Sequence, residues 1–285
     1  MRKSFASSSP ISAPVSTFGS TGWPCIVAFP GPPRVGSRAG AVSCTRVELS
    51  ILIPCLNEEA CLPPLLDRLE AMLRASPFAT RGGAEVIFVD DGSTDGTWAI
   101  LERAVRERGF VTAHRHERNR GLAAAWRTGV THARGRLVCT FDADLQYRPE
   151  DIPRLYGALE ASGADLAQGS RSERRDTGSR LWMSRCLSAL LNAMFGMRLA
   201  DNKSGFVMCH RHVWADLLSY RGRYAHWQIL LLVAAHAKGY RIHQVPTPFD
   251  ARVHGRSFLT DLPLRVVLHV LADLVRGVVE YRLGL

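Results

Sequence analysis

Acidic side chains follow three short apolar runs of this 285-residue chain. The three clusters are Asn57-Glu58, Asp90-Asp91 and Asp142-Ala143-Asp144, and each run has the composition of a buried strand. Open parallel sheets bind ligands at the carboxyl ends of their strands, so we expect the clusters to meet at one rim. Like charges that converge there need a cation to offset them. The clusters therefore predict a divalent metal site that serves an anionic ligand.

The segment 142–146 holds the strongest candidates for the metal ligands. If this segment is extended, Asp142, Asp144 and Gln146 lie on the same side of it. Oxygen ligands of this kind suit Mg²⁺ or Mn²⁺, and two carboxylates leave room for the phosphates of a bound ligand. The alternative is a solvated acidic turn without a metal, because an Asp-x-Asp sequence is common by chance.

A basic segment is the second signal. Residues 171–185 include five arginines, and apolar residues follow at helical spacing as far as Phe195. A basic segment that continues into an apolar helix face is typical of a membrane surface where a lipid phosphate enters. The competing interpretations are a solvated charged surface for the arginines and core packing for the apolar face.

Alternating strand and helix patterns would position these clusters. The patterns predict strands at 49–54, 85–89, 110–115, 136–141 and 165–170, with helices after 57 and at 95–108, 120–133 and after Pro149. Asn57 is the expected N-cap of the first helix, with Glu58 and Glu59 in its first turn. This alternation predicts an α/β fold with a mostly parallel sheet covered by helices on both faces.

Four sequence blocks stand in the order and spacing of a known enzyme family. They are PCLNE at 54–58, DDGSTDGT at 90–97, NRG at 119–121 and DADLQ at 142–146. Together they resemble family 2 glycosyltransferases with the GT-A (Rossmann-like) fold. The similarity extends over residues 47–258, and it is greatest with the branch that uses dolichyl or polyprenyl phosphates. The chain departs from the family pattern at Leu56, where a tyrosine is common, and at Phe258, where a lysine is usual.

The resemblance implies a site for a GDP- or UDP-linked sugar. Its binding residues would be Pro54, Leu56, Glu58, Val89, Asp91, Asp142, Ala143 and Arg252. Glu58 would bond the ribose and Asp91 would read the edge of the base. Arg252 belongs to a loop, 252–257, that would close over the diphosphate.

The resemblance also implies the metal, catalytic and acceptor residues. Asp144 and Gln146, together with Asp142, would bind Mg²⁺ or Mn²⁺. The residues that would act in catalysis are Asp142, Asp144 and Arg252, and those that would bind an acceptor phosphate are Arg171, Arg180 and Ser184.

The chemistry of the acceptor follows from its charge. A phosphate monoester is already anionic near pH 7, so arginines that position it suffice and no general base is needed. Relatives with hydroxyl acceptors often carry a late catalytic carboxylate, and the comparable helix here offers Gln228. We therefore expect an inverting, metal-dependent glycosyltransferase that uses a polyprenyl phosphate. The alternatives are a hydroxyl acceptor, such as a glycan or a small metabolite, and a non-catalytic lipid- or glycan-binding homologue.

The chain is expected to divide into three parts. Residues 1–46 are interpreted as a disordered or wrongly assigned N-terminal extension, 47–258 as the glycosyltransferase domain and 259–285 as an amphipathic helix. In that helix a narrow polar stripe opposes a wide apolar face. Packing on the domain, packing on a second subunit and contact with a membrane all fit this pattern, so a homo-oligomer and a peripheral membrane protein are both open.

Composition and charge exclude other classes. The formal net charge is +10, but five basic residues and no acidic one fall within the first 47, which leaves +5 for the rest. That small excess and the lack of an aromatic and basic stacking platform argue against a nucleic-acid partner. The seven cysteines show no zinc or disulfide spacing, and no run of about 20 apolar residues predicts a transmembrane helix. A cytoplasmic protein, peripheral on the inner membrane face if it contacts a membrane, is the expectation.

Overall fold

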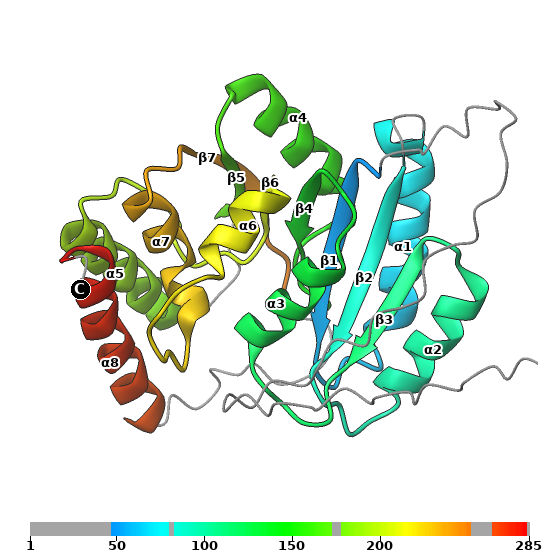
Figure 1. The fold of residues 1–285 in the computed structure, drawn as a ribbon, viewed down its shortest axis with the longest axis horizontal. Helices are drawn as coiled ribbons and strands as arrows, with labels where there is room; N and C mark the ends of the chain where they lie inside the picture. The colour runs from blue at the N-terminus through cyan, green and yellow to red at the C-terminus, as the bar shows by residue number, and fades with distance from the viewer. Residues whose placement is uncertain (1–46, 80–82, 173–177, 252–263, 284–285) are drawn as a thin grey trace, which may run out of the picture. The chain divides into compact units, whose positions relative to one another are not determined.

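A single seven-stranded sheet organises the computed structural model, which describes residues 47–79, 83–172, 178–251 and 264–283 (Figure 1). Its strand order is β3-β2-β1-β4-β6-β5-β7. The strands are β1 (Leu49–Cys55), β2 (Ala84–Asp90), β3 (Val111–Arg115), β4 (Leu137–Thr140), β5 (Leu166–Ser172), β6 (Val207–His210) and β7 (Ile242–Pro248). All neighbouring pairs are parallel except β4–β6 and β5–β6, in which β6 runs antiparallel. The expected mostly parallel sheet is confirmed.

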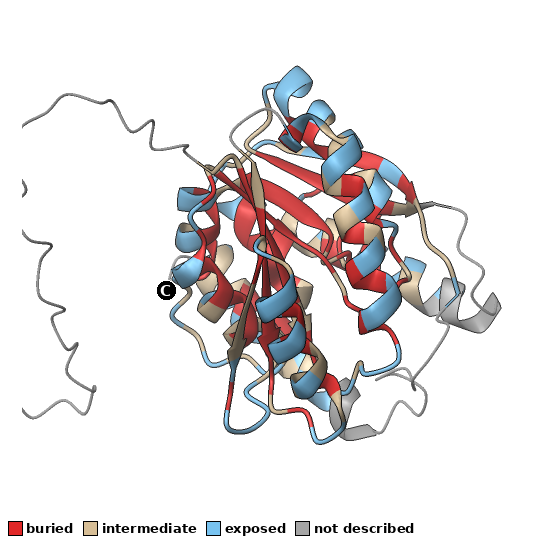
Figure 2. Ribbon diagram, turned by 90° about the vertical axis from the view of Figure 1, so that its right-hand side faces the viewer, coloured by how far each residue is buried: buried red, intermediate tan, exposed pale blue. Residues whose placement is uncertain are grey.

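Helices cover both faces of the sheet, as the continuous apolar composition of its strands requires. Ile51 of β1 packs in one core with α1 (Leu62–Ala75), α2 (Thr97–Glu107) and α4 (Ile152–Ser162). The next residue, Leu52, points to the opposite core with α3 (Leu122–His132), α6 (Arg211–Leu217) and α7 (Leu231–Ala237). Figure 2 shows the buried strands between these two layers. Successive side chains of one strand thus hold two helix layers together.

Two further helices lie beyond this sandwich. These are α5 (Gly178–Phe195) and α8 (Leu264–Tyr281), and a third apolar cluster joins them to α7 through Leu191, Val233 and Leu274. Three short 3₁₀ helices complete the described chain: η1 (Pro77–Ala79), η2 (Pro149–Asp151) and η3 (Trp227–Leu230). None of the helices in the described ranges is long and apolar enough to span a bilayer.

The expected start of the first helix is wrong. The helix α1 begins at Leu62 after Cys61, without a side-chain cap and without an acidic residue in its first turn. Asn57 instead adopts a left-handed conformation (φ 56°) in the loop before it. Asn tolerates this conformation because its short side chain can bond locally, so the residue serves the loop and not the helix. The later helix that was expected after Pro149 is α4, and Pro149 itself begins η2, which leads into α4.

Candidate active site

The carboxyl ends of β1, β2 and β4 meet at one rim, as the acidic clusters predict. Cys55 at the end of β1 pairs with Asp90 at the end of β2, and Leu52 pairs with Thr140 at the end of β4. The loops that follow these ends are 56–61, 91–96 and 141–148. The sheet therefore brings the first, second and fourth sequence blocks together, because neighbouring parallel strands end on the same side.

The first two loops are locked to each other by hydrogen bonds. The Asn57 amide donates to Ser93 Oγ at 2.9 Å, and the Thr94 amide donates to Asn57 Oδ1 at 2.8 Å. The Glu58 amide donates to Thr97 Oγ1 at 2.9 Å. The hydroxyl residues of the DDGSTDGT block thus bind the neighbouring loop. Their role in loop geometry was not visible from the sequence, because it depends on the register between two strands.

The side chains expected around the nucleoside differ in their exposure. Pro54 and Glu58 are half-buried, and Leu56 is exposed. Val89 is completely buried and packs in the core with Trp126 of α3. A side chain in that position supports the wall of a site and does not form its surface.

Asp91 is held by donors from the third sequence block. Its Oδ1 lies 2.6 Å from His116 Nδ1 and accepts the Arg120 amide at 2.9 Å. Its Oδ2 accepts the Gly121 amide at 2.8 Å. The second ring nitrogen of His116, Nε2, lies 2.9 Å from Thr128 Oγ1 in α3. A buried chain of polar groups therefore connects β2 to α3 through Asp91 and His116, a histidine that the sequence analysis did not single out.

The contact between these two loops requires a glycine at position 92. The residue has φ +82°, and a Cβ on it would meet the Arg118 carbonyl carbon at 2.6 Å. Any side chain would push the loop at 118–121 away from Asp91. The DDG and NRG blocks are thus two halves of one loop contact.

The segment 142–146 is a turn, so the expected extended alternation is wrong. Leu145 is buried in a left-handed conformation (φ 61°), and Asp144 Oδ1 accepts the Gln146 amide at 3.1 Å. Gln146 Nε2 donates to the main-chain oxygen of Asp250 at 3.1 Å. Because its nitrogen is used in this way, the amide oxygen of Gln146 is the atom that a cation could take. The shape of this turn therefore comes from the local hydrogen bond between Asp144 and Gln146, and not from strand periodicity.

The donor set fits a hard divalent cation in part. Carboxylate and amide oxygens are what Mg²⁺ and Mn²⁺ prefer, and Asp144 is almost buried. Within the described ranges no group of three or more His, Cys, Asp or Glu side chains gathers to hold an ion. These residues therefore fit an ion whose remaining ligands come from a bound diphosphate, and not a fully protein-bound ion.

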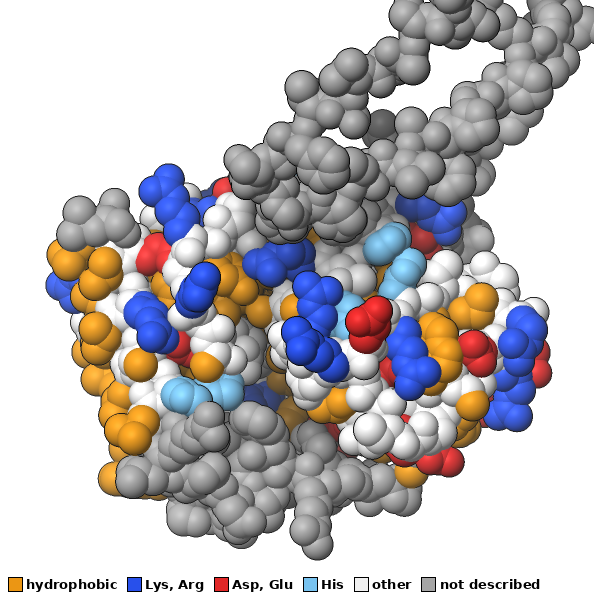
Figure 3. Space-filling view, turned by 60° about the horizontal axis from the view of Figure 1, so that its bottom comes forward, with side chains coloured by type: hydrophobic (Ala, Val, Ile, Leu, Met, Phe, Trp, Pro, Cys, Tyr) orange, Lys and Arg blue, Asp and Glu red, His pale blue; other side chains and the backbone are white. Residues whose placement is uncertain are grey.

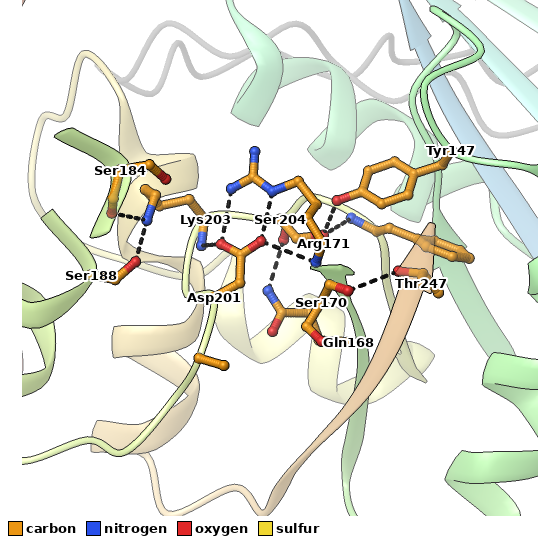
Figure 4. A network of polar contacts seen from close by, with 12 residues as sticks. Tyr147, Gln168, Ser170, Arg171, Ser184, Ser188, Asp201, Lys203, Ser204 and Thr247 are labelled. Carbon is orange, nitrogen blue, oxygen red and sulfur yellow. Dashed lines mark hydrogen bonds and ion pairs between the residues drawn. The ribbon is translucent and has the colours of Figure 1, made fainter. Parts of the chain in front are cut away.

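A buried ion pair forms the second half of the site (Figure 4). Arg171, at the end of β5, donates from Nε to Asp201 Oδ2 at 2.6 Å and from an η nitrogen to Asp201 Oδ1 at 2.9 Å. Burial raises the pKa of Asp201, but the hydrogen bonds and charge of Arg171, with a smaller effect of Lys203, lower it to about 2. Both groups are therefore charged at neutral pH, and the pair is a fixed feature of the fold.

Lys203 connects this pair to helix α5. Its ammonium donates to the main-chain oxygen of Ser184 at 2.9 Å and to Ser188 Oγ, while its amide donates to Asp201 Oδ1 at 3.1 Å. Figure 4 shows Lys203 between Asp201 and the two serines. Ser184 is thus connected to the Arg171 pair through Lys203, and its place in an acceptor site stays a prediction. Arg180 belongs to the same helix, but its side chain lies outside the described residues, as do Arg252 and Phe258.

The two halves of the site adjoin. Burial lowers the pKa of Arg171, but the bonds and charge of Asp201 raise it more strongly, with a further contribution from the negative charge of Asp142. The Arg171 guanidinium also lies over the Phe249 ring at 5.4 Å. Tyr147 donates to or accepts from Ser204 Oγ at 2.6 Å, next to this pair. The charge of the metal candidate Asp142 therefore acts on the phosphate candidate Arg171.

Sequence reasoning missed several polar residues that build this half. Besides Lys203 and Ser188, the buried Gln168 of β5 accepts from Gln244 of β7 at 2.6 Å, and Gln244 also donates to the Asp201 main-chain oxygen at 2.6 Å. The signal that could have found them is a glutamine inside an apolar strand, since a buried amide needs partners.

The sequence matches the model of a known family. The family is "Glycosyl transferase family 2", and the match covers residues 50–218. A curated relative from Pseudomonas paraeruginosa, undecaprenyl-phosphate 4-deoxy-4-formamido-L-arabinose transferase, is 35% identical over 80% of this chain and 64% of its own length. Dodecaprenyl-phosphate galacturonate synthase from Rhizobium johnstonii is 33% identical over 79% of this chain and 66% of its own length. The chain thus spans just under two thirds of these relatives.

Solved structures share the fold at lower identity. Glucosyl-3-phosphoglycerate synthase from Mycobacterium tuberculosis, in complex with Mn²⁺, UDP and glucosyl-3-phosphoglycerate, has a TM-score of 0.59 at 23% identity over 79% of both chains. A mannosyltransferase from Pyrobaculum calidifontis, in complex with GDP-Man and Mn²⁺, has a TM-score of 0.59 at 19% identity over 81% of this chain and 65% of its own. The expected GT-A fold is confirmed by this likeness.

Proposed function

Because the chain belongs to glycosyl transferase family 2, we propose that it transfers a sugar from a nucleotide sugar to a polyprenyl phosphate with inversion at the sugar. The observation that carries the proposal is the buried Arg171–Asp201 pair next to Asp142. The two curated relatives, which are named for undecaprenyl and dodecaprenyl phosphate, support the choice of acceptor. The transfer would take place at a membrane surface, on its cytoplasmic side, because a polyprenyl phosphate is held in a bilayer.

The Arg171 guanidinium suits an acceptor phosphate. Asp201 takes two of its five N–H groups through Nε and one η nitrogen, which leaves three directed away from that carboxylate. A guanidinium that is oriented by a carboxylate loses little further entropy when it binds phosphate oxygens. In the proposal, Arg180 and Ser184 on α5 complete the contact with the phosphate.

The same surroundings argue against a general base beside Arg171. Asp201 has a pKa of about 2, because its pairing with Arg171 outweighs its burial, and such a carboxylate takes a proton poorly. Burial raises the pKa of Tyr147 far above its usual range, so its phenol stays protonated. A phosphate monoester is already ionised and needs no such base, whereas a sugar hydroxyl would.

The donor would bind at the rim of β1, β2 and β4. We propose that Glu58, Asp91 and their locked loops hold the nucleoside, with Pro54, Leu56, Val89 and Ala143 as the surrounding wall. Asp142, Asp144 and Gln146 would hold Mg²⁺ or Mn²⁺ together with the diphosphate, and Arg252 would contact the diphosphate from the other side. The cation would neutralise the charge that grows on the departing nucleoside diphosphate. UDP and GDP-Man in the two solved structures make uridine and guanosine donors the first to try.

A product assay tests the proposal directly. Purified protein with Mn²⁺ and a panel of UDP- and GDP-sugars would be incubated with and without undecaprenyl phosphate, and lipids would be analysed by mass spectrometry. We expect a glycosyl-phosphoryl-lipid from one donor. Donor hydrolysis without a lipid product would indicate a hydroxyl acceptor, and the absence of any turnover would favour a binding protein. Either result would overturn the proposed acceptor.

His116→Ala is expected to raise the KM for the donor about tenfold and to leave the KM for the acceptor unchanged. The variant removes the ring nitrogen Nδ1, which lies 2.6 Å from Asp91 Oδ1. Asp91 is then held less firmly, and so is the loop at 119–121 that Asp91 orients. Steady-state kinetics with each substrate varied would measure this split. His243→Ala, an exposed histidine on β7, is the control that should match the wild type. Equal changes in both KM values would contradict a role in donor positioning.

Lys203→Met is expected to affect the KM for the acceptor and not the KM for the donor. The variant keeps the length of the side chain but loses the bonds to Ser184 and Ser188 that hold α5 against the Arg171 pair. We expect the acceptor KM to rise about tenfold and the donor KM to change less than twofold. Lys203→Arg should recover part of the loss. Lys238→Met, which removes a surface pair with Asp216, is the matched control.

A further inference from the structure

Helix α8 turns its acidic side chains toward the domain. Asp273 is almost completely buried and accepts the main-chain amides of Ala225 at 3.2 Å and His226 at 2.7 Å. About two turns later, Glu280 accepts the amides of Arg221 at 2.9 Å and Gly222 at 3.0 Å. Asp273 and Glu280 thus lie on the packing face of the helix, together with Leu274 and the partly buried Val270.

The aliphatic face of α8 is left exposed as a consequence. Leu268, Leu271, Val275 and Val279, which follow at helical steps, have exposures of 55%, 50%, 65% and 40%. We call these four residues the α8 aliphatic face. Figure 3 shows hydrophobic side chains gathered along the edge of the molecule where α8 lies, at the left of the view. A contiguous apolar face of this kind on a helix marks an interaction site.

The charges around this face suit an anionic surface. In the described parts of 182–203, 218–230 and 264–283, both aspartates are buried and Glu280 is turned inward to its hydrogen bonds. The exposed charged side chains there are all arginines, namely Arg185, Arg198, Arg221, Arg223, Arg276 and Arg282. Arginines beside an inserted aliphatic face are the combination that binds anionic lipid headgroups.

A second copy of the chain fits the face less well. Four half-exposed aliphatic side chains present a few hundred Å² at most, on the order of half the roughly 800 Å² per partner of a standard interface. In a two-fold symmetric dimer, the exposed arginines around the face of one copy would also meet those of the other copy, and like charges oppose such contact. A lipid surface has neither difficulty.

Helix α8, which carries this face, also packs with helix α5 of the acceptor half of the site. Helix α5, whose Ser184 and Ser188 are held by Lys203, packs through Leu191 into the same cluster as Leu274 of α8. At the end of α5, the main-chain oxygen of Met194 accepts a bond from Arg282. A surface that holds α8 would therefore lie next to the helix that carries the expected phosphate residues.

We propose that the α8 aliphatic face inserts into the surface of an anionic bilayer, while Asp273 and Glu280 hold the helix to the domain. The docking itself follows from the exposed face and the arginine rim. Its role in presenting a lipid acceptor to α5 rests on the function proposed above.

Vesicle sedimentation tests the docking without any turnover. The double variant Leu271→Asp, Val275→Asp would be compared with the wild type on vesicles of phosphatidylcholine with half phosphatidylglycerol, and on pure phosphatidylcholine. We expect the wild type to sediment with the anionic vesicles, more weakly at high salt, and the double variant to bind at least tenfold more weakly. Val105→Asp, an exposed aliphatic residue on α2, is the matched control and should bind as the wild type does.

The outcomes separate the occupants of the face. Wild-type protein that ignores anionic vesicles, or a double variant that binds them equally well, would overturn the proposal. A wild-type dimer in light scattering that the double variant converts to a monomer, with vesicle binding unchanged, would assign the face to a second copy. The variant Leu271→Gln, Val275→Thr adds no charge and should weaken vesicle binding in the same direction, which guards against an effect on folding.

Activity assays keep this inference apart from the proposed function. We expect the double variant to retain wild-type turnover on a short, water-soluble prenyl phosphate but to lose at least tenfold on undecaprenyl phosphate in anionic vesicles. An equal loss on both acceptors would contradict a docking role. If the wild type turns over neither acceptor, the proposed function fails, while the sedimentation result still decides the docking.

Discussion

Asp144→Asn is expected to abolish Mn²⁺-dependent binding of the nucleotide sugar and to leave the fold intact. The neutral amide cannot supply the charge that draws a divalent cation to the turn at 142–146. Its oxygen can still accept the Gln146 amide, which Asp144 Oδ1 now accepts at 3.1 Å, so the turn should keep its shape. We expect kcat/KM to fall at least a hundredfold, on the order of 3 kcal/mol in transition-state stabilisation.

Isothermal titration of the donor with and without Mn²⁺ would measure this loss, and a thermal melt would confirm the fold. Asp67→Asn is the control, because Asp67 of α1 is exposed and pairs with Arg108 at the end of α2. An unchanged metal-dependent titration in Asp144→Asn would remove Asp144 from the metal site. It would also favour the alternative interpretation, a solvated acidic turn without a metal.

Asp201→Ala should have the largest effect on stability. The substitution leaves the Arg171 guanidinium, whose side chain is only 14% exposed, without its two charged hydrogen bonds. A buried charge that loses its partner costs roughly 3–5 kcal/mol in the free energy of unfolding. Urea unfolding would measure this change. Asp216→Ala, which breaks the more exposed pair with Lys238, should cost about 1 kcal/mol or less.

The same pair predicts a dependence of stability on pH. The pKa of Asp201 falls from 3.8 to about 2 on folding, because its bonds with Arg171 outweigh its burial. A lowered pKa stabilises the fold above the unfolded value, so the contribution is complete above about pH 4 and is lost as pH falls toward 2. It amounts to about 2 kcal/mol. Wild type and Asp201→Asn should therefore converge in unfolding free energy between pH 4 and pH 2, and a constant difference would contradict the assignment.

In the proposed reaction, the two halves of the candidate site would serve different needs. The rim of β1, β2 and β4 is built from loops locked by main-chain bonds, which suits a nucleotide that must be held in one register. The Arg171–Asp201 pair is a fixed cation, which suits an acceptor that brings its own charge. The charge of Asp142 acts on Arg171. In the proposed reaction, a sugar bound between the two halves would lie next to the phosphate that attacks it.

The sequence by itself indicated the family and the mostly parallel sheet, and it placed the acidic clusters at one rim of that sheet. Short apolar runs such as 49–54 and 85–89 could only be buried strands, and the composition of the turns that follow marked one rim. These features are local, so periodicity and turn chemistry reveal them. The antiparallel strand β6 and the edge strand β7 were not predicted, because their pairing depends on partners far along the chain.

Only the tertiary structure decided how the site residues are used. Segment 142–146 forms a turn and is not extended, and Asn57 bonds the neighbouring loop instead of capping a helix. His116 bonds Asp91, and Lys203 bonds Ser184, two residues that the motifs had named. It also chose the packing face of α8: Asp273 and Glu280 find main-chain donors on the domain, so the aliphatic residues face outward. Amphipathic spacing shows that a helix has two faces. Which face is buried depends on donors that other segments supply, and no pattern within the helix contains them.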